Sequence, residues 1–375
     1  MADTGLQLRT RINDDNTLTL WLEDTPVPQP GPDQVLIRVG AAPINPSDLA
    51  LLFGPADMST ARVSGSPERP VVTADIPPAA MRIVQARVGQ ALPAGNEGAG
   101  EVIAAGSSAA AQALLGKTVG VFGGEMFGQY RCVSAQACLV LNEDTSAEEG
   151  ASCFVNPMTA LGMVETLHLE NHSALVHTAA ASNLGQMLNR LCIADDIPLV
   201  NIVRKDEQAA LLQAQNAEYV VNSEAADFQQ QLLAALDSTD ATLAFDAIGG
   251  GKLGSTILNS MEAVAARKMT EYNRYGSNTF KQLYIYGALD LGPTMLTRNF
   301  GFAWNIGGWL LPLFLQKVGM QKAGEMRSRV AAEIKTTFAS HYTSKVSLAE
   351  ALSLEAIGAY NRRATGEKYL VLPQA

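Results

Sequence analysis

The sequence has few cysteines and few histidines. The four cysteines are Cys132, Cys138, Cys153 and Cys192, and their spacing matches no paired Cys-x-x-Cys zinc framework. The four histidines form no His-Glu-x-x-His arrangement. Two of them, His168 and His172, lie four residues apart and are expected to be surface residues on one helix face. We therefore expect buried or half-buried free thiols in a reducing compartment, and no metal site built by the protein.

Basic residues and long hydrophobic runs are also scarce. Lys and Arg total 27 against 37 acidic residues, a net charge of −10, and no basic block suggests a nucleic-acid surface. The most apolar run, 306–314, is too short to span a bilayer and contains Pro312. The N-terminus lacks the apolar core of a signal peptide. We expect a cytoplasmic protein with two domains that binds neither nucleic acid nor membrane.

The first 150 residues have the pattern of a β-rich domain. Short apolar runs bounded by Gly, Pro or Asp are typical of strands, and the clearest are 34–39, 101–104 and 117–122.

From about residue 151 the pattern becomes an alternation of strands and helices. Strands are expected at 174–178, 198–203, 219–221, 241–246 and 283–286, the last closing the series, and helices at 156–167, 185–193, 207–215, 226–236 and 253–264. Such alternation predicts an α/β domain with a parallel sheet covered on both faces. After Trp304 the pattern is helical to about residue 338, and a final strand is expected at 368–372.

A turn of small residues follows the first strand of this alternating half. Thr178 to Gly185 leads directly into a helix, where backbone N–H groups can hold a dinucleotide pyrophosphate. In the usual Gly-x-Gly-x-x-Gly pattern, glycines would stand at Ala180, Ser182 and Gly185, and only the third is present. The expected cofactor-binding residues here are Ala181, Ser182, Asn183, Leu184 and Gly185. The alternative is that small residues stand here for packing alone.

Two cationic residues, Arg204 and Lys205, follow the second strand, which ends at Val203. Sites selective for NAD place an acid at this strand end, whereas an Arg accommodates the 2′-phosphate of NADP. The sequence therefore predicts NADPH as the cofactor; the alternative is a solvated turn.

The order of motifs along the chain resembles that of the medium-chain dehydrogenase/reductase superfamily. The motifs are Ile-Asn-Pro-Ser-Asp at 44–48, Gly-Asn-Glu-Gly-Ala-Gly-Glu-Val at 95–102, Thr-Ala at 159–160, the turn ending at 185, Phe-Asp-Ala-Ile-Gly-Gly at 245–250, Tyr-Gly-Ala at 286–288, 299–304 and 366–373. The resemblance covers nearly the whole chain. It implies a GroES-like catalytic domain over 1–150, completed by 340–375, and a Rossmann NADP-binding domain over 151–339. It also implies a homodimer that pairs through the last Rossmann strand, near 283–286 or the apolar stretch after it.

Zinc enzymes of this superfamily carry Cys at the position of Asn45 and His at the position of Asn96. Amides are not plausible ligands of a catalytic zinc, and the four-cysteine zinc lobe is missing. This excludes an NAD-linked zinc alcohol dehydrogenase. The resemblance is therefore to the zinc-free quinone oxidoreductases and 2-enoyl thioester reductases. It implies hydride transfer from NADPH to a small hydrophobic quinone or enone.

The resemblance also implies roles for particular residues. Asn45, Asn96 and Thr159 are the expected catalytic residues. Asn45 would hold substrate or a water, or else bond to the backbone, Asn96 would face the active-site cleft and Thr159 the nicotinamide. Contacts on the nicotinamide-ribose side are expected from Gly249, Tyr286, Gly287, Phe302 and Trp304, although the last two aromatics have core packing as their alternative.

The chain departs from the enoyl reductases in two ways. They carry a tyrosine proton donor shortly after Asn-Pro-Ser-Asp, and residues 51–58 contain none. Quinone reduction can take protons from solvent, so this favours a quinone oxidoreductase. The chain also has extra residues within 59–90, expected as a lid or substrate-shaping loop, or else as an ornamental loop or subunit contact. The alternatives are a 2-enoyl thioester reductase and a non-catalytic nucleotide-binding protein of the same fold.

Overall fold

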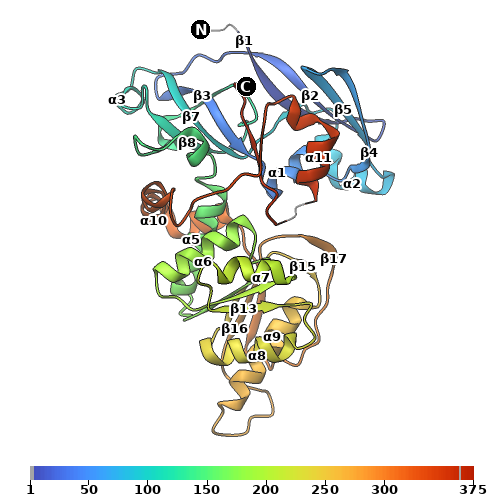
Figure 1. Cartoon of the computed structure of the whole chain (residues 1–375), viewed down its shortest axis with the longest axis vertical. Helices are drawn as coiled ribbons and strands as arrows, with labels where there is room; N and C mark the ends of the chain where they lie inside the picture. The colour runs from blue at the N-terminus through green and yellow to red at the C-terminus, as the bar shows by residue number, and fades with distance from the viewer. Residues whose placement is uncertain (1–3, 363–364) are drawn as a thin grey trace. The chain divides into compact units, whose positions relative to one another are not determined.

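The computed structural model describes residues 4–362 and 365–375. The chain divides into two compact units, one formed by residues 1–155 with 329–375 and the other by residues 156–328 (Figure 1). Sequence alone placed these limits at 150 and 339. The two units are described separately below as unit 1 and unit 2.

Unit 1 is built from two sheets. The first has the strand order β4-β5-β2-β1-β6 and is antiparallel. Its strands are β1 (Thr4–Ile12), β2 (Thr17–Pro26), β4 (Asp57–Ser66), β5 (Arg69–Asp75) and β6 (Leu92–Pro93). The second has the order β10-β8-β7-β3-β20-β19, with β9 also paired to β3. Its strands are β3 (Gln34–Pro43), β7 (Glu97–Ala105), β8 (Thr118–Phe122), β9 (Tyr130–Ser134), β10 (Leu139–Val140), β19 (Ser344–Val346) and β20 (Tyr369–Val371).

The C-terminal segment completes the second sheet. β20 pairs antiparallel with β3, Leu370 opposite Pro43. The short helices of the unit are α1 (Pro46–Leu52), α2 (Met81–Val84), α3 (Ala109–Gln112), α4 (Ala147–Gly150) and α11 (Leu354–Asn361).

The segment 59–90 is a hairpin followed by short helical turns, not the expected loop. β5 pairs with β2, and its alternate residues Val72 and Ala74 are fully buried, so a period-2 pattern places one face in the core. β4 forms the exposed edge of the sheet, and most of its side chains face solvent. Pro67 lies in the turn between β4 and β5, Pro70 near the start of β5, and Pro77 and Pro78 in the segment after it, where a missing N–H is tolerated.

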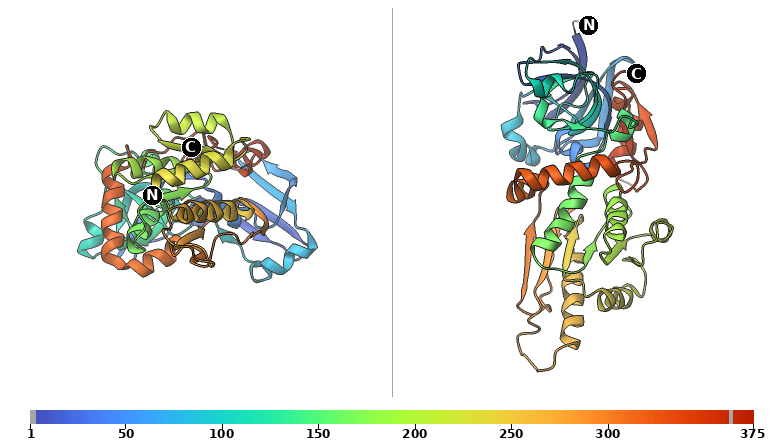
Figure 2. Two further views of the ribbon diagram at one scale, coloured as in Figure 1. Left: turned by 90° about the horizontal axis from the view of Figure 1, so that it is seen from below. Right: turned by 90° about the vertical axis from the view of Figure 1, so that its left-hand side faces the viewer.

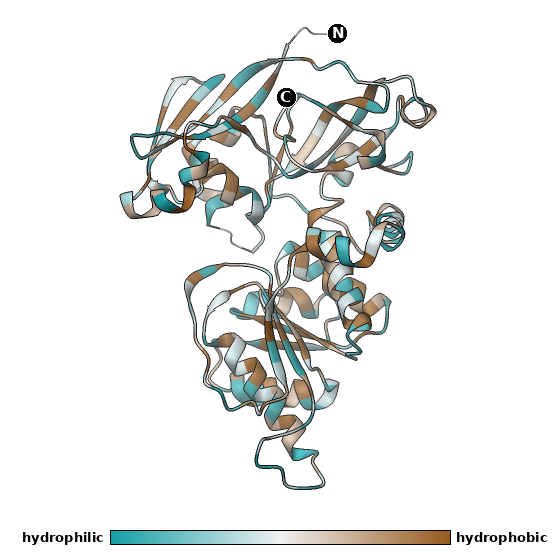
Figure 3. Ribbon diagram, turned by 180° about the vertical axis from the view of Figure 1, so that it is seen from behind, coloured by the Kyte–Doolittle hydropathy of each residue, from teal (hydrophilic) through white to brown (hydrophobic). Residues whose placement is uncertain are grey.

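Unit 2 confirms the expected parallel sheet between helices. Its strand order is β13-β12-β11-β14-β16-β18. The strands are β11 (Leu175–His177), β12 (Leu199–Val203), β13 (Tyr219–Asn222), β14 (Leu243–Asp246), β16 (Lys281–Ile285) and β18 (Trp304–Gly308). The helices are α5 (Val155–Leu169), α6 (Asn183–Ala194), α7 (Asp206–Gln213), α8 (Phe228–Thr239), α9 (Leu253–Arg267) and α10 (Leu311–Glu333), seen from two further sides in Figure 2. All five residues of β12 are buried, because helices cover both faces, and apolar positions gather on the strands (Figure 3).

The strand β18 corrects the expected helix after Trp304. Residues 304–308 pair in parallel with β16, and α10 begins only at Leu311. Gly307 and Gly308 disfavour a helix here. The edge of the sheet is therefore β18, and the segment 283–286 lies one strand inside it. A small parallel pair, β15 (Gly249–Gly251) with β17 (Asp290–Thr294), was not expected from the sequence.

The side chains with potential metal or redox chemistry are dispersed. None of the four cysteines forms a disulfide; Cys153 and Cys192 are buried and the other two half-buried, as expected. His168 is exposed on α5, but His172 lies beyond the end of that helix, so the two do not share a helix face. Over residues 4–362 and 365–375, no group of three or more His, Cys, Asp or Glu is placed to hold a metal. Within the same residues, no helix is long and apolar enough to cross a bilayer.

Candidate functional site

The small-residue turn expected to bind pyrophosphate lies at the carboxyl end of β11. Ser182 caps the helix α6, and its Oγ accepts a hydrogen bond from the Gly185 N–H at 3.1 Å. A Cβ on Gly185 would lie 2.1 Å from the carbonyl oxygen of Ala180, so only glycine fits there. Ala179 takes the left-handed conformation, with φ of 51°, that a glycine would take more easily. The turn is thus built without the first two glycines, and Asn183 and Leu184 begin the helix whose N-terminus favours an anion.

Arg204 and Lys205 follow β12, which neighbours β11 in the sheet. The last strand residue, Val203, is buried, whereas both cationic side chains are exposed. Neither forms an ion pair with any residue that the structure describes. The Arg204 backbone N–H donates to Gln208 Oε1 at 3.0 Å, which fixes the turn after the strand. Two free positive charges therefore lie at the carboxyl edge of the sheet, where dinucleotides bind.

Asp246, at the end of β14, ties this edge together. Its carboxylate accepts hydrogen bonds from Thr178 Oγ1 at 2.7 Å, and from the backbone N–H groups of Ile248 at 2.9 Å and Gly249 at 3.2 Å. Gly249 has φ of 80°, a conformation that L side chains rarely adopt. The phosphate turn and the β14 end are thus held in one arrangement before any ligand binds.

An apolar pocket lies at the carboxyl ends of β16 and β18. Its volume is about 450 Å³, and it is lined by Ile285, Tyr286, Gly287, Ala288, Gly308, Trp309, Leu310 and Leu313. A Cβ on Gly287 would lie 2.6 Å from the carbonyl oxygen of Ala247, so the wall requires glycine. Sequence reasoning named Tyr286 and Gly287 but missed the other side of the pocket, because β18 was not recognised as a strand. The Gly307-Gly308 pair after an apolar run was the available signal.

Phe302 and Trp304 do not belong to this edge. In the parallel pairing of β16 and β18, Trp304 lies opposite Lys281, at the amino ends of both strands. Trp304 packs edge-on against Phe300 with ring centroids 4.8 Å apart. Phe302 is 79% exposed and contacts Tyr275. The structure therefore corrects the expected cofactor contact of these two aromatics and supports the core-packing alternative for Trp304.

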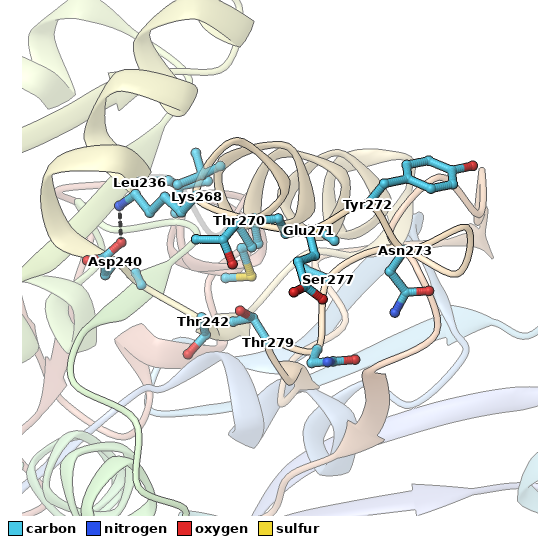
Figure 4. A pocket seen from close by; sticks show the side chains of 16 residues that line it. Leu236, Asp240, Thr242, Lys268, Thr270, Glu271, Tyr272, Asn273, Ser277 and Thr279 are labelled. Atoms are coloured by element: carbon cyan, nitrogen blue, oxygen red, sulfur yellow. Dashed lines mark hydrogen bonds and ion pairs between the residues drawn. The ribbon is translucent and has the colours of Figure 1, made fainter.

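A larger cavity, of about 870 Å³, lies at the amino edge of the same sheet. It is lined by the ends of α8 and α9 and by the segment 268–280, with an ion pair between Lys268 and Asp240 (Figure 4). Its lining contains none of the residues expected to bind the cofactor. This cavity and the apolar pocket therefore lie at opposite edges of the sheet.

Unit 1 brings Asn45 and Asn96 together around a buried carboxylate. Asp48, 1% exposed, accepts hydrogen bonds from the backbone N–H of Asn45 at 2.8 Å and of Asn96 at 2.7 Å. Asn96 Nδ2 donates to Ser47 Oγ at 3.0 Å. Asn45 is only 2% exposed, and its Nδ2 donates to Glu97 Oε1 at 2.8 Å. The third expected catalytic residue, Thr159, is buried on α5 in unit 2.

Glu97 is the second buried acid of this cluster, which sequence reasoning did not single out. Its Oε2 accepts from the backbone N–H groups of Phe154 and Val155, both at 2.8 Å. Lys368, also buried, donates to Ser152 Oγ at 2.7 Å. Burial raises the pKa of Glu97 and lowers the pKa of Lys368 to about 8. The arrangement is suited to orienting Asn45 and its turn.

The cluster gives a pH-dependent stability. Burial raises the pKa of Asp48 from 3.8 to about 7. Between these two pH values, the Asp48 carboxyl keeps its proton in the folded state and loses it in the unfolded state. The contribution of this group to the free energy of unfolding therefore falls as the pH rises from about 4 to about 7. We expect Asp48→Asn to have a lower free energy of unfolding than wild type, with the largest difference at low pH. This difference should shrink by more than about 1 kcal/mol by pH 7. Urea unfolding of both proteins at several pH values measures this difference, and a constant difference would contradict it.

The chain is similar in sequence to two known reductases. No family model matches the sequence. The chain is 26% identical over 224 residues to the mitochondrial enoyl-[acyl-carrier-protein] reductase of Mus musculus, covering 58% of this chain and 52% of that protein. It is 28% identical over 200 residues to prostaglandin reductase-3 of Mus musculus, covering 53% and 45%. The matches thus span about half the length of these curated relatives.

Similar solved structures cover the whole chain. A protein described as an NADPH:quinone reductase from Mesorhizobium loti matches with a TM-score of 0.74 and 26% identity, over 100% of this chain and 99% of that one. The complex of Etr1p with NADP and crotonyl-CoA matches with a TM-score of 0.66 and 16% identity, over 99% and 100%, which shows the fold alone. Together with the ordered motifs, these findings make the chain similar in sequence and in fold to zinc-free members of the medium-chain dehydrogenase/reductase superfamily.

Proposed function

We propose that the protein is a zinc-independent oxidoreductase that uses NADPH to reduce a quinone or another conjugated carbonyl compound. The observation that carries the proposal is the carboxyl edge of the unit 2 sheet. There, an anion-binding helix start, two exposed cations without ion-pair partners and an apolar pocket lie at the ends of neighbouring strands. This combination has the charges and the shape of a dinucleotide carrying an extra phosphate.

The residues present fit each part of NADPH. The N–H groups at the start of α6, beside Gly185, would hold the pyrophosphate, and the guanidinium of Arg204 with Lys205 would hold the 2′-phosphate. The pocket formed by Tyr286, Gly287 and the residues after β18 would hold the nicotinamide. The glycines at 185 and 287 are the positions where any side chain would collide with backbone.

When bound, NADPH would supply a hydride from C4, and this hydride together with one proton from solvent would convert a quinone to the neutral quinol. The chain supplies orientation and hydrogen bonds. We propose that Asn96, half-buried and held by Ser47 and Asp48, contributes a polar contact to the acceptor, and that Thr159 contributes to binding the nicotinamide. Asn45 would act mainly by holding Glu97 and its own turn, since its side-chain amide already donates a hydrogen bond to Glu97 Oε1.

The second candidate is a 2-enoyl thioester reductase, which the name of the mouse enoyl reductase supports. The residues after α1 argue against it. Phe53 is buried and stacks on Tyr360, with ring centroids 5.8 Å apart, and no tyrosine stands at 51–58 to donate a proton. A substrate whose reduction needs no protein acid suits this chain better.

NADPH oxidation followed by absorbance separates these candidates. We expect turnover with 1,4-benzoquinone or 9,10-phenanthrenequinone that is unchanged by a metal chelator, and at least tenfold slower turnover with crotonyl-CoA. Faster turnover of crotonyl-CoA would favour the enoyl reductase. Tight NADPH binding with no turnover of any acceptor would instead favour a non-catalytic nucleotide-binding protein.

We also propose a homodimer that pairs through the edge strand β18. Its backbone groups on one side have no neighbouring strand among the described residues, and an unpaired edge is suited to pairing with a second copy. Sedimentation equilibrium distinguishes a dimer from a monomer.

A further inference from the structure

We infer that His177 is a positioning residue that fixes the wall of the apolar pocket through a buried hydrogen bond to Tyr286. This rests on the proposed NADPH site and concerns the part that would hold the nicotinamide. His177 ends β11 immediately before the phosphate turn, and Tyr286 immediately follows β16. Because β14 lies between these strands, the hydrogen bond joins two strand ends across a third.

The geometry of the pair is tight and its charge state is fixed. His177 Nε2 lies 2.7 Å from the Tyr286 hydroxyl, and the two rings stack with centroids 5.7 Å apart and an interplanar angle of 21°. His177 is fully buried, and burial lowers its pKa to about 3, so the imidazole is neutral at physiological pH. Burial raises the pKa of Tyr286, so its phenol stays protonated. The hydrogen bond therefore persists over the whole working pH range.

Placing a histidine at position 177 has an energetic cost, because its other ring nitrogen is buried without a hydrogen-bond partner in the described part of the chain. Nδ1 of His177 is buried and has no hydrogen-bond partner among the residues that the structure describes. A neutral imidazole carries one N–H, and leaving a buried N–H unpaired costs more than leaving a lone pair. We therefore assign the proton to Nε2, which donates to the Tyr286 oxygen. An apolar side chain at this position would leave no buried nitrogen unsatisfied. The hydrogen bond to Tyr286 therefore accounts for the presence of a histidine here.

What it holds is a wall of the pocket. Tyr286 lines the pocket beside Gly287, and its ring also packs edge-on against Phe245, with centroids 6.5 Å apart and an angle of 67°. Arg204, at the adenosine end of the proposed site, follows β12. In the strand order, β12 lies on one side of β11, and β14 and β16 lie on the other. Loss of the hydrogen bond to the Tyr286 hydroxyl should therefore disturb the proposed nicotinamide-binding pocket and leave the proposed adenosine-binding residues unchanged.

The test compares two ligands that differ only in the presence of the nicotinamide ring. Dissociation constants are measured for NADPH and for 2′-phospho-ADP-ribose, which has the adenosine, the 2′-phosphate and the pyrophosphate but no nicotinamide. We expect Tyr286→Phe, which removes only the hydroxyl, to weaken NADPH binding about tenfold and fragment binding less than about twofold. His177→Phe should do the same. His177→Gln can keep an N–H donor and should restore part of the loss.

Tyr284→Phe is the matched control. Tyr284 lies on β16, two residues before Tyr286, and its ring also contacts Phe245. Its hydroxyl, however, donates to Glu170 Oε1 at 2.8 Å, and it is not among the residues that line the pocket. Its ratio of the two dissociation constants should stay at the wild-type value. Equal effects on both ligands, no effect in Tyr286→Phe, or the same effect in Tyr284→Phe would overturn the role of the pair. A wild-type protein that binds neither ligand would overturn the proposed function itself, and with it this inference.

Discussion

Arg204→Ala is expected to remove the preference for NADPH over NADH. The dissociation constant for NADPH should rise about 10- to 100-fold, because the guanidinium would no longer form a charge-assisted contact with the 2′-phosphate. Binding of NADH, which lacks that phosphate, should change less than about threefold. The double variant with Lys205→Ala should lose NADPH affinity further. Nicotinamide fluorescence titrations with both nucleotides measure the change.

Arg267→Ala controls for a general loss of positive charge. Arg267 is exposed in the last turn of α9, at the amino edge of the same sheet, and carries the same charge. Its replacement should leave both dissociation constants at the wild-type values. If Arg204→Ala weakened NADPH and NADH equally, Arg204 would act on a part common to both nucleotides, and the assignment of the 2′-phosphate would fail.

Glu97→Ala is expected to cost about 3–5 kcal/mol of the free energy of unfolding. The change leaves two buried backbone N–H groups and the Asn45 amide without their acceptor. It also removes a buried negative charge that favours the charged form of Lys368. Urea denaturation of unit 1, followed by a signal local to that unit, measures the loss. Glu97→Gln keeps one acceptor oxygen and should cost clearly less.

Glu101→Ala is the control on the same strand. Glu101 forms an exposed ion pair with Arg38, and such surface pairs are worth less than about 1 kcal/mol. If the two alanine variants lost similar stability, the network around Glu97 would not be the anchor that its hydrogen bonds indicate.

The fold of unit 2 was largely predictable because its pattern is local. Short apolar runs followed by helical periodicity located β11, β12, β13, β14 and β16 and the helices between them, and the parallel sheet is confirmed. β18 was missed because its apolar residues continue into the helix after it, and only the pairing of 304–308 with β16 makes them a strand. The hairpin within 59–90 was missed for the same reason, since its strands are defined by pairing with β2 and with each other.

In the candidate site, too, the features that are contiguous in the sequence could be predicted and those that depend on long-range pairing could not. The phosphate turn and Arg204 are contiguous features, and both lie where a parallel sheet places a dinucleotide; their roles stay predictions. Trp304 was assigned to the wrong edge, because its position depends on the direction and start of an unrecognised strand. His177 and Tyr286 are 109 residues apart, and Asn45 and Glu97 are 52 apart. Sequence periodicity holds no information on such long-range pairs.

The most direct test of the account is a titration of the purified wild-type protein with NADPH and, separately, with NADH, following nicotinamide fluorescence. We expect saturable binding of NADPH that is at least tenfold tighter than binding of NADH. Binding of neither nucleotide would mean that a phosphate turn with one glycine of three does not hold the pyrophosphate, and would contradict the proposed function. Tighter binding of NADH would contradict the role given to Arg204 and Lys205.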